Sequence, residues 1–419
     1  MSPDGSPRRP YGSGAGTDPT RADGPTERLA TVPRRHDRLA ARRAREQRIR
    51  RRRRVLAVVV TVLLAALAGG GYLLYQSFFG VPDFDGEGTG SVVVQVADGD
   101  TTSAIAAELA GRGVVADPRA FLRAAADDDR VRAIQPGYYQ LRARMSGEAA
   151  VELMLNPDSR VGQLEIRGGT QLDDTRSPDG AVTPGVLSLI SEATCLTVDG
   201  QRRCVSADEL RTAMSTTDPA ELGVPEWALE DVAKADPNRR LEGLLVPGRY
   251  NVAPEKPAAD VLRELLAVSA SKLQASGLVS GAREIGSSPY QVLIISSLVE
   301  KEAITKDMPK VARVIYNRLG VGQRLELDSM VNYPLDVQSL RTTAADRARP
   351  GPYNSYQVVG LPPTPIAAPG ADAIAAALDP EPGDWFFFVR CETDGTSCFA
   401  RTLDEHQENV NKALRNGAF

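Results

Sequence analysis

An uncharged apolar stretch at 55–75 (VLAVVVTVLLAALAGGGYLLY) constrains the fold of this chain more than any other feature. As a helix it is long enough to cross about 30 Å of hydrocarbon. Twelve arginines lie from Arg34 to Arg54, directly before it, and such positive charge stays on the cytoplasmic side. The alternative is a cleavable signal peptide, but the stretch is longer than a signal-peptide core and no convincing small-residue cleavage site follows. We therefore predict a retained single-pass anchor in the plasma membrane, with the N-terminus in the cytoplasm.

The anchor also divides the chain by charge. Residues 1–54 hold 16 arginines against 6 acidic residues, a net charge of +10. Because the whole chain carries −4 and residues 55–79 are uncharged, the part from Gly80 onward carries −14. An acidic folded part argues against nucleic acid as its partner. The basic arm suits the anionic inner leaflet of the cell membrane, and a cytoplasmic protein partner is the alternative.

Composition and element patterns then predict an α+β protein of several segments. Residues 1–33 are rich in Gly, Pro, Ser, Thr and Asp with few apolar clusters, which is typical of disorder. The expected segments are a disordered Arg-rich cytoplasmic arm at 1–54, a transmembrane helix with its interface at 55–79, a linker at 80–90, a small α+β subdomain at 91–156 and a larger mixed α+β domain at 157–419.

The small subdomain has a strand–turn–helix pattern without a plausible catalytic cluster. Strands are expected at 91–96 and 138–144, and helices at 102–110, 118–126 and 147–155, the last capped by Ser146. This pattern resembles a LysM-type module, and LysM modules bind amino-sugar polymers. The alternative is a packing module that only spaces the larger domain from the membrane.

All four cysteines lie on the far side of the predicted membrane segment. Cys195 and Cys204 flank one turn sequence, and Cys391 and Cys398 flank another, so each pair suits a disulfide across a hairpin. A zinc site is the alternative, but the spacings do not match a zinc ribbon and His406 is the one histidine in this part. The same shortage argues against a Ser-His-Asp triad or a His-rich metal centre, and we expect no metal and no cofactor.

The strongest candidate for chemistry is a helix predicted at 290–302. Between 292 and 299 it is apolar almost all round, which is typical of a buried helix. Glu300 is the first carboxylate at its end, where desolvation favours the protonated acid that a general acid requires. Glu302 lies about 200° further round the helix, so we expect it to face solvent or an ion pair. The alternative is that both carboxylates only lie at the end of a core helix and have no chemical role.

Several further elements are expected around this helix. A strand is predicted at 161–167, and another at 325–328 leading to Asp328. Asp307 is expected to cap the helix that follows residue 302. The Pro- and Gly-dense loop at 350–370 has the composition of a long ordered loop that lines a site.

Six short motifs follow one another beyond the anchor. They are 297–302 (SLVEKE), 310–319 (KVARVIYNRL), 325–328 (LELD), 353–356 (YNSY), 360–370 (GLPPTPIAAPG) and 399–406 (FARTLDEH). In this order behind an N-terminal anchor, they resemble the endolytic murein transglycosylases, the MltG or YceG-like family. The similarity extends over about 92–413 and includes 241–250 (LEGLLVPGRY).

The resemblance implies a membrane-anchored lytic transglycosylase, with 157–419 as its catalytic domain. Such an enzyme cleaves the β-1,4 bond between N-acetylmuramic acid and N-acetylglucosamine in nascent peptidoglycan, leaves 1,6-anhydro ends and so terminates strand elongation. The resemblance implies that Glu300 acts first as acid and then as base, without the second carboxylate of ordinary glycosidases. The implied partners are peptidoglycan glycan strands and the cell membrane, with peptidoglycan synthases as further candidates.

The resemblance also implies a set of groove residues. The matching positions are Asp328, Asn317, Arg318, Tyr353, Asn354 and Tyr356. The alternative for each is a satisfied polar group of a loop or helix. The chain departs from the family pattern at Glu326, where glutamine is usual, at Thr364, and at Cys398, which stands where histidine is common.

Two rival functions remain open. A hydrolytic muramidase would need a second carboxylate about 5–10 Å from Glu300, for which Asp328 is the candidate. A non-catalytic scaffold of the wall-synthesis machinery would use only the LysM-like unit and the cytoplasmic arm.

Overall fold

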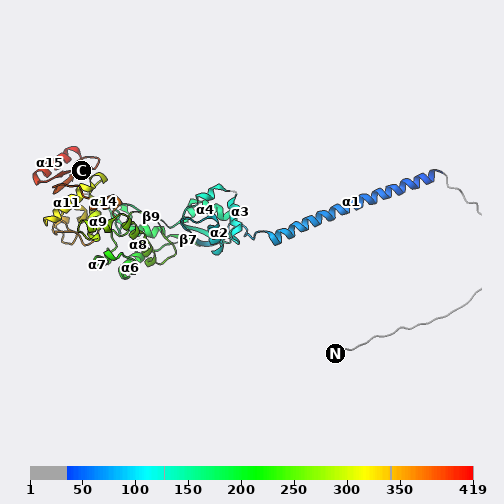
Figure 1. Cartoon of the computed structure of the whole chain (residues 1–419), viewed down its shortest axis with the longest axis horizontal. Helices are drawn as coiled ribbons and strands as arrows, with labels where there is room; N and C mark the ends of the chain where they lie inside the picture. Colours follow the sequence, from blue (N-terminus) through cyan, green and yellow to red (C-terminus); the bar gives the residue numbers. More distant parts are fainter. Residues whose placement is uncertain (1–34, 127, 340–341, 419) are drawn as a thin grey trace, which may run out of the picture. The chain divides into compact units, whose positions relative to one another are not determined.

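The computed structural model describes residues 35–126, 128–339 and 342–418. The chain falls into two units that divide after Gly80. The first contains helix α1 (Arg35–Phe79), and the second contains every other helix and strand of the described residues (Figure 1).

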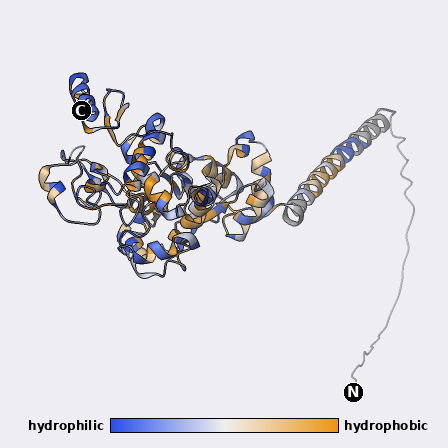
Figure 2. Cartoon of the chain, turned by 60° about the vertical axis from the view of Figure 1, so that its left-hand side comes forward, coloured by the Kyte–Doolittle hydropathy of each residue, from blue (hydrophilic) through white to orange (hydrophobic). Residues whose placement is uncertain are grey.

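Helix α1 is continuous and changes character along its length. Figure 2 shows a hydrophilic part followed by a hydrophobic one. Residues 35–54 contain neither Gly nor Pro and are rich in Arg, Ala and Leu, which favour helix. They are therefore helical rather than disordered as expected, while residues 1–34 of that arm lie outside the described residues. Within the described ranges, Arg50–Tyr72 is the one helical stretch long and apolar enough to cross a membrane.

The second unit begins with a small domain around a three-stranded antiparallel sheet of order β1-β2-β3. The hydroxyl groups of Thr101 and Ser146 cap its first and last α-helices. Phe121 and Leu141 are among the fully buried side chains of its separate hydrophobic core. The predicted elements at 91–155 are confirmed to within two residues. They are β1 (Thr89–Val96), α2 (Thr102–Gly111), α3 (Pro118–Ala126), β2 (Gly137–Ala143) and α4 (Gly147–Leu155). Two short 3-10 helices, η1 (Asp129–Ala133) and η2 (Pro157–Ser159), were not predicted.

The strand predicted at 161–167 is broken into β3 (Arg160–Val161) and β4 (Gln163–Ile166) by Gly162. Gly162 has a φ of 74°, and a Cβ there would lie 2.1 Å from a backbone carbonyl oxygen of the larger domain. Strand β3 pairs with β2 in the small domain, whereas β4 pairs with β9 (Gly248–Asn251). The chain therefore passes from one domain to the next at Gly162.

The larger domain is mainly helical, and its described strands form four two-stranded antiparallel sheets. Its remaining elements are β5 (Thr175–Arg176), β6 (Val182–Thr183), α5 (Val186–Ala193), β7 (Leu196–Val198), β8 (Gln201–Arg203), α6 (Ala207–Thr216), α7 (Glu226–Lys234), α8 (Ala258–Ala275), α9 (Leu278–Glu284), α10 (Pro289–Glu302), η3 (Thr305–Asp307), α11 (Met308–Gly320), α12 (Asp328–Asn332), α13 (Ala344–Ala348), α14 (Ala371–Leu378), β10 (Phe387–Arg390), β11 (Ser397–Ala400) and α15 (Leu403–Asn416). The mixed α+β class expected for this part is confirmed.

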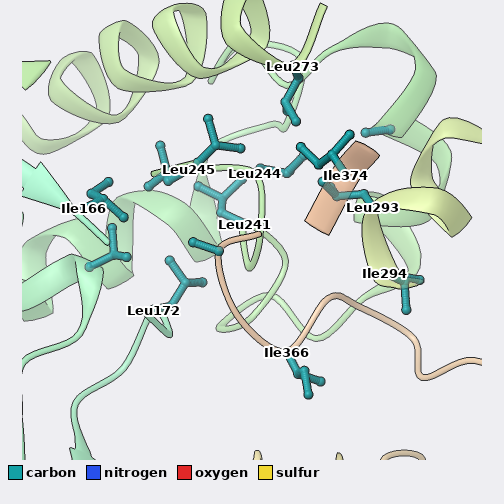
Figure 3. Packing of buried hydrophobic residues seen from close by; sticks show 14 of the residues in the cluster. Ile166, Leu172, Leu241, Leu244, Leu245, Leu273, Leu293, Ile294, Ile366 and Ile374 are labelled. Atoms are coloured by element: carbon teal, nitrogen blue, oxygen red, sulfur yellow. The ribbon is translucent and has the colours of Figure 1, made fainter. Parts of the chain in front are cut away.

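Helix α10 runs through the hydrophobic core of this domain. Every residue from Val292 to Val299 is buried, as predicted. The helix packs against α14, α11 and α9. Leu293 and Ile374 lie near Leu241 and Leu244 of the segment between α7 and β9 (Figure 3). Since such cores are close-packed, the end of α10 is held rigidly.

Two local predictions near α10 are wrong. Asp307 precedes α11, but its side chain makes no capping hydrogen bond; it accepts the backbone N–H of Ser397 at 2.7 Å and so fastens the C-terminal hairpin to that helix. Residues 325–327 form no strand, and Asp328 is the first residue of α12. Glu326 has a φ of 50°, which interrupts an extended conformation.

Both predicted cysteine pairs are disulfide-bonded in the structure. Cys195–Cys204 closes the β7–β8 hairpin, and Cys391–Cys398 closes the β10–β11 hairpin. No cysteine among the described residues is free, so these sulfur atoms are not zinc ligands here.

Candidate active site

Helix α10 carries Glu300 from the core toward the surface. The helix begins at a capping box formed by Ser288 and Gln291. Near its other end, the Ser297 hydroxyl accepts a hydrogen bond of 3.0 Å from the backbone N–H of Ile366, in the Pro- and Gly-dense loop before α14. Glu300 follows one helical turn later at a half-buried position. The loop and the helix are thereby fixed to each other just before the carboxyl group.

The carboxyl group of Glu300 lies between two glycines. Gly370 donates its backbone N–H to Oε2 of Glu300 at 2.9 Å. On the other side, a Cβ added to Gly168 would lie 2.3 Å from Oε1 of Glu300. A side chain at residue 168 would therefore displace the carboxyl group, which is held in one orientation with Oε2 occupied by a donor.

The two glycines belong to segments that pair with each other. Gly169 donates its N–H to the carbonyl oxygen of Ala368 at 2.9 Å, and Ala368 donates its N–H to the carbonyl oxygen of Thr170 at 2.8 Å. The Lys301 ammonium group adds a bond of 3.3 Å to the carbonyl oxygen of Gly169. We call residues 168–172 and 368–370 the carboxyl clamp, since together they enclose the Glu300 side chain.

Glu302 is half-buried and forms no ion pair among the described contacts, which differs from the expectation that it faces solvent or an ion pair. Helix α12 packs against α10, and the Ser329 N–H donates a hydrogen bond of 3.4 Å to Oε1 of Glu302. Burial raises the pKa of Glu302, although hydrogen bonds from Ser329 act in the opposite direction. The nearby carboxylate of Asp328 raises this pKa further. The end of α10 therefore presents two carboxyl groups in different environments.

Asp328, at the start of α12, is the centre of a polar cluster. One carboxylate oxygen accepts the Thr342 hydroxyl at 2.6 Å and the Tyr356 hydroxyl at 2.8 Å. The other accepts the Arg347 guanidinium at 3.3 Å. The Arg347 guanidinium also lies over the Tyr356 ring, 4.6 Å from its centroid. Asp328 and Tyr356 are partly exposed, so this cluster borders the surface near Glu302.

Asn317 and Arg318 lie on α11, and their polar atoms are bound to backbone carbonyl groups. The Asn317 amide donates to the carbonyl oxygen of Trp385 at 2.9 Å. The buried Arg318 side chain donates to the carbonyl oxygens of Phe386 at 2.6 Å and Leu325 at 2.8 Å. These two residues join the C-terminal hairpin and the approach to α12 to helix α11.

Tyr353 and Asn354 are also buried and internally bonded. The hydroxyl of Tyr353 lies 2.8 Å from that of Thr364. The Asn354 amide donates to the carbonyl oxygens of Arg347 at 2.9 Å and Arg349 at 2.6 Å. Four of the six predicted groove residues thus hold loops in place, while Asp328 and Tyr356 lie at the surface end of the same network.

A buried glutamate that the sequence reading did not single out lies behind the carboxyl clamp. Glu242 is 2% exposed and accepts the backbone N–H of Leu172 at 3.1 Å and the Tyr333 hydroxyl at 2.8 Å. Burial raises the pKa of Glu242 to about 7. The position of Glu242 in the motif 241–250 was the available signal, since a carboxylate among leucines is costly to bury.

Gly168, Gly370 and Lys301 were likewise not predicted as site residues. Gly370 ends a motif quoted above, but nothing local indicates that its N–H meets a carboxylate 70 positions earlier. The described ranges contain no group of three or more His, Cys, Asp or Glu side chains arranged to hold a metal ion.

The chain matches one family model and several known proteins. The model of the YceG-like family matches residues 94–412. The chain is 25% identical over 327 residues to the endolytic murein transglycosylase of Bacillus subtilis (strain 168), covering 77% of this chain and 85% of that protein. It is 32% identical over 177 residues to the endolytic murein transglycosylase of Streptococcus pneumoniae (strain D39), covering 41% of this chain and 32% of that protein.

A solved structure has a similar fold. The crystal structure of a yceG-like protein from Listeria monocytogenes superposes with a TM-score of 0.50 and 25% sequence identity. The match covers 76% of this chain and 98% of that one. The Streptococcus relative is longer than the matched region, since the shared part is about a third of its length.

Proposed function

The chain belongs to the YceG-like family, and from that premise we propose that it is an endolytic lytic transglycosylase of peptidoglycan. Its substrate is the β-1,4 bond between N-acetylmuramic acid and N-acetylglucosamine within nascent glycan strands. Its products are a strand with a 1,6-anhydro-muramyl end and a strand with a free N-acetylglucosamine 4-hydroxyl. Cleavage terminates elongation of the strand. The proposal is supported by the Bacillus and Streptococcus relatives, which bear the name endolytic murein transglycosylase.

The observation that carries this proposal is the clamped carboxyl group of Glu300. Because Oε2 accepts the Gly370 N–H, the acidic proton resides on Oε1, beside Gly168. This proton passes to the glycosidic oxygen as the C1–O bond breaks. The muramyl 6-hydroxyl then bonds to C1 and returns its proton to the Glu300 carboxylate. No water is consumed, and a single carboxyl serves as acid and then as base.

The other site residues support this reaction in two ways, by contacting the glycan or by holding the loops around it. Asp328 and Tyr356 are the partly exposed polar groups of the α12 cluster, and we assign them to contact with the glycan. Asn317, Arg318, Tyr353 and Asn354 shape the groove by holding the loops that form it.

The remaining regions suit work at the cell membrane. Arg50–Tyr72 serves as a single-pass anchor, with the basic arm in the cytoplasm and both domains of the second unit outside. The small domain is a LysM-like module that contacts amino-sugar polymer. The domain limits are the expected ones, except that the small and larger domains meet at Gly162. Peptidoglycan synthases, which make the nascent strand, are the protein partners that this function calls for.

The test is mass spectrometry of purified peptidoglycan after incubation with the full-length chain in detergent, beside its Glu300→Gln variant. We expect 1,6-anhydro-ended fragments from the wild type. The variant should lose at least about a hundredfold in rate, because it cannot donate the proton. Its unfolding temperature should match that of the wild type, since the amide can still accept the Gly370 N–H.

Other products would point elsewhere. Fragments with reducing ends would mean hydrolysis by water and would direct attention to Asp328 and Glu302 as second carboxylates. A wild-type chain that binds glycan without cutting it would leave only a scaffold role.

A further inference from the structure

Glu242 is a charged group buried where it touches no surface. It lies in the turn-rich segment between α7 and β9, surrounded by Leu241 and Leu244 of the main core. Its two carboxylate oxygens accept two donors, the N–H of Leu172 and the hydroxyl of Tyr333. A buried carboxylate is costly unless such donors are supplied, so the fold maintains this contact at the expense of stability.

The two donors come from the two structures that border the candidate acid. Leu172 is the last residue of the first segment of the carboxyl clamp, whose other end, Gly168, lies against Oε1 of Glu300. Tyr333 directly follows α12, the helix that carries Asp328 and Ser329. Glu242 therefore joins the clamp to α12 from behind.

The clamp also forms hydrogen bonds with other segments, through atoms other than the Leu172 N–H. The carbonyl oxygens of Gln171 and Leu172 accept the N–H groups of Val186 and Leu187 at the start of α5. Thr170 is paired with the opposite segment of the clamp. Glu242 supplies the acceptor for the Leu172 N–H.

The environment of Glu242 is mostly neutral. The charged groups that act on it are Asp173 of the adjoining loop, Arg239 on the preceding turn and Lys301 of α10. The tyrosines Tyr290, Tyr333 and Tyr353 complete the surroundings. Arg239 lies over the Tyr333 ring, 4.9 Å from its centroid, and forms no ion pair with Glu242 among the described contacts. Since no cation among the described residues is close, the two neutral donors, the Leu172 N–H and the Tyr333 hydroxyl, stabilise the negative charge of the carboxylate.

We propose that Glu242 is a positioning residue that, as a carboxylate, holds the carboxyl clamp and α12 in register around Glu300. The inference rests on the proposed transglycosylase function. Glu242 touches no glycan; it acts by fixing Gly168 against the acid and by holding α12, which carries Asp328, through Tyr333. Protonation of Glu242 converts one of its acceptor oxygens into a donor, so the Leu172 and Tyr333 contacts cannot both be kept at full strength.

This arrangement predicts that the cleavage rate declines at low pH, and we call this decline the low-pH limb. Because burial raises the pKa of Glu242 to about 7, the carboxylate becomes protonated as the pH falls through neutrality. The rate should decline as the pH falls, because the register of the clamp and α12 is lost. A variant that cannot titrate at residue 242 should therefore lack this decline.

The experiment measures initial rates of anhydro-fragment release from pH 5 to 9 by the full-length chain in detergent, with unfolding temperatures at each pH. Glu242→Gln should lower the maximal rate roughly tenfold to a hundredfold, with little change in the glycan concentration for half-maximal rate. Its low-pH limb should vanish. At pH 8 its unfolding temperature should equal or exceed that of the wild type, because a buried charge has been removed.

Asp307→Asn is the matched control. Asp307 is also a buried carboxylate that accepts a backbone N–H, but it fastens the C-terminal hairpin. This variant should lose unfolding temperature and keep the wild-type pH profile. The inference is overturned if Glu242→Gln keeps the low-pH limb, if its rate loss tracks a fall in unfolding temperature, or if Asp307→Asn flattens the profile equally.

Tyr333→Phe provides a second variant that keeps the carboxyl group. Since the Tyr333 hydroxyl lowers the pKa of Glu242, its removal should move the low-pH limb to higher pH. An unmoved limb would overturn the inference even if Glu242→Gln failed to fold. If the wild type cuts glycan and Glu300→Gln does not, these failures concern Glu242 alone. If the wild type yields no anhydro ends, the proposed function fails and the inference fails with it.

Discussion

The small domain and the larger domain of the second unit bury different kinds of side chain. Among the described residues from 89 to 161, Ser159 is the one buried non-aromatic polar side chain, and ion pairs such as Arg119–Asp117 are at the surface. The larger domain buries many polar groups. They include Gln171, Arg240, Glu242, Ser296, Ser297, Asp307, Arg318, Asn332, Thr342, Asn354, Ser355 and Thr364.

The difference shows that buried side chains have two roles: apolar ones fold a domain, and polar ones fix the positions of particular segments. An apolar core folds a domain without needing any particular polar contact, as in the small domain. A buried polar group adds desolvation cost and must be hydrogen-bonded, so it is kept where geometry is needed. In the larger domain most of these groups connect α10, α11, α12 and the loops around Glu300. We expect mutations of matched residue types to behave differently in the two domains.

The largest difference should come from matched arginines. Arg318→Ala should cost about 3 kcal/mol of unfolding free energy, because it leaves buried carbonyl oxygens and Glu326 without their donor. Arg130→Ala removes exposed ion pairs to Asp128 and Glu152 and should leave the unfolding midpoint unchanged within error. Chemical denaturation of both variants checks this. Equal losses would mean that the two domains use polar contacts alike.

The pH dependence of stability should differ next. The raised pKa of Glu242 means that the folded state keeps a proton which the unfolded chain releases above about pH 4.5. Stability therefore falls as the pH rises from about 4.5 to about 7, by up to about 3 kcal/mol. In the small domain, hydrogen bonds from Arg119 lower the pKa of Asp117 to about 2, so that contribution has the opposite sign.

Denaturation of the wild type and Glu242→Gln between pH 5 and 8 measures the contribution of Glu242 to the pH dependence of stability. The variant should show a flatter dependence. Curves of equal slope would show that Glu242 does not carry the pH dependence of the larger domain.

Matched glycines should give an intermediate effect, visible in activity rather than stability. Gly168→Ala should lower the cleavage rate roughly tenfold, because the new Cβ would lie 2.3 Å from Oε1 of Glu300 and push the acid aside. Gly111→Ala, at the end of α2, meets nothing within 4 Å and should leave the rate unchanged. Rates of anhydro-fragment release decide between them. An active Gly168→Ala variant would argue against the clamp geometry.

Matched tyrosines should give the smallest effect. Tyr356→Phe removes the hydrogen bond to Asp328 and should weaken glycan binding by about 1 kcal/mol, which is several-fold. Tyr139→Phe removes the bond to the Gln135 carbonyl oxygen in the small domain. It should lower stability by a similar amount with no change in the cutting rate. Glycan-concentration curves and denaturation, run on both, would show whether the roles separate in this way.

Much of the fold could be read from short segments. Pro118 and Ala126 bound α3 in the structure as they do in the prediction, because a proline in the first turn and a short run of helix formers define a helix locally. Ser146 caps α4 as expected for the same kind of reason. The two disulfides also follow from cysteines seven and nine residues apart, since hairpin partners are near in sequence.

The prediction failed where a segment is covered by a distant one. Glu302 was expected to face solvent or an ion pair because it lies about 200° round the helix from Glu300, yet α12 packs against α10 and Ser329 donates a hydrogen bond to Glu302. Glu326 adopts a positive φ, so the short strand expected before Asp328 does not form.

The sequence by itself determined the helices of the small domain with their Ser146 cap, an apolar stretch long enough to cross a membrane, and the position of Glu300 at the end of a buried helix. Tertiary structure decided how that carboxyl group is held. Gly370 and Glu300 are 70 residues apart, as are Leu172 and Glu242, and both bonds exist only after the core has formed. Periodicity and capping act over a few residues, whereas desolvation and hydrogen bonding of a buried carboxylate depend on whichever segments the fold brings to it.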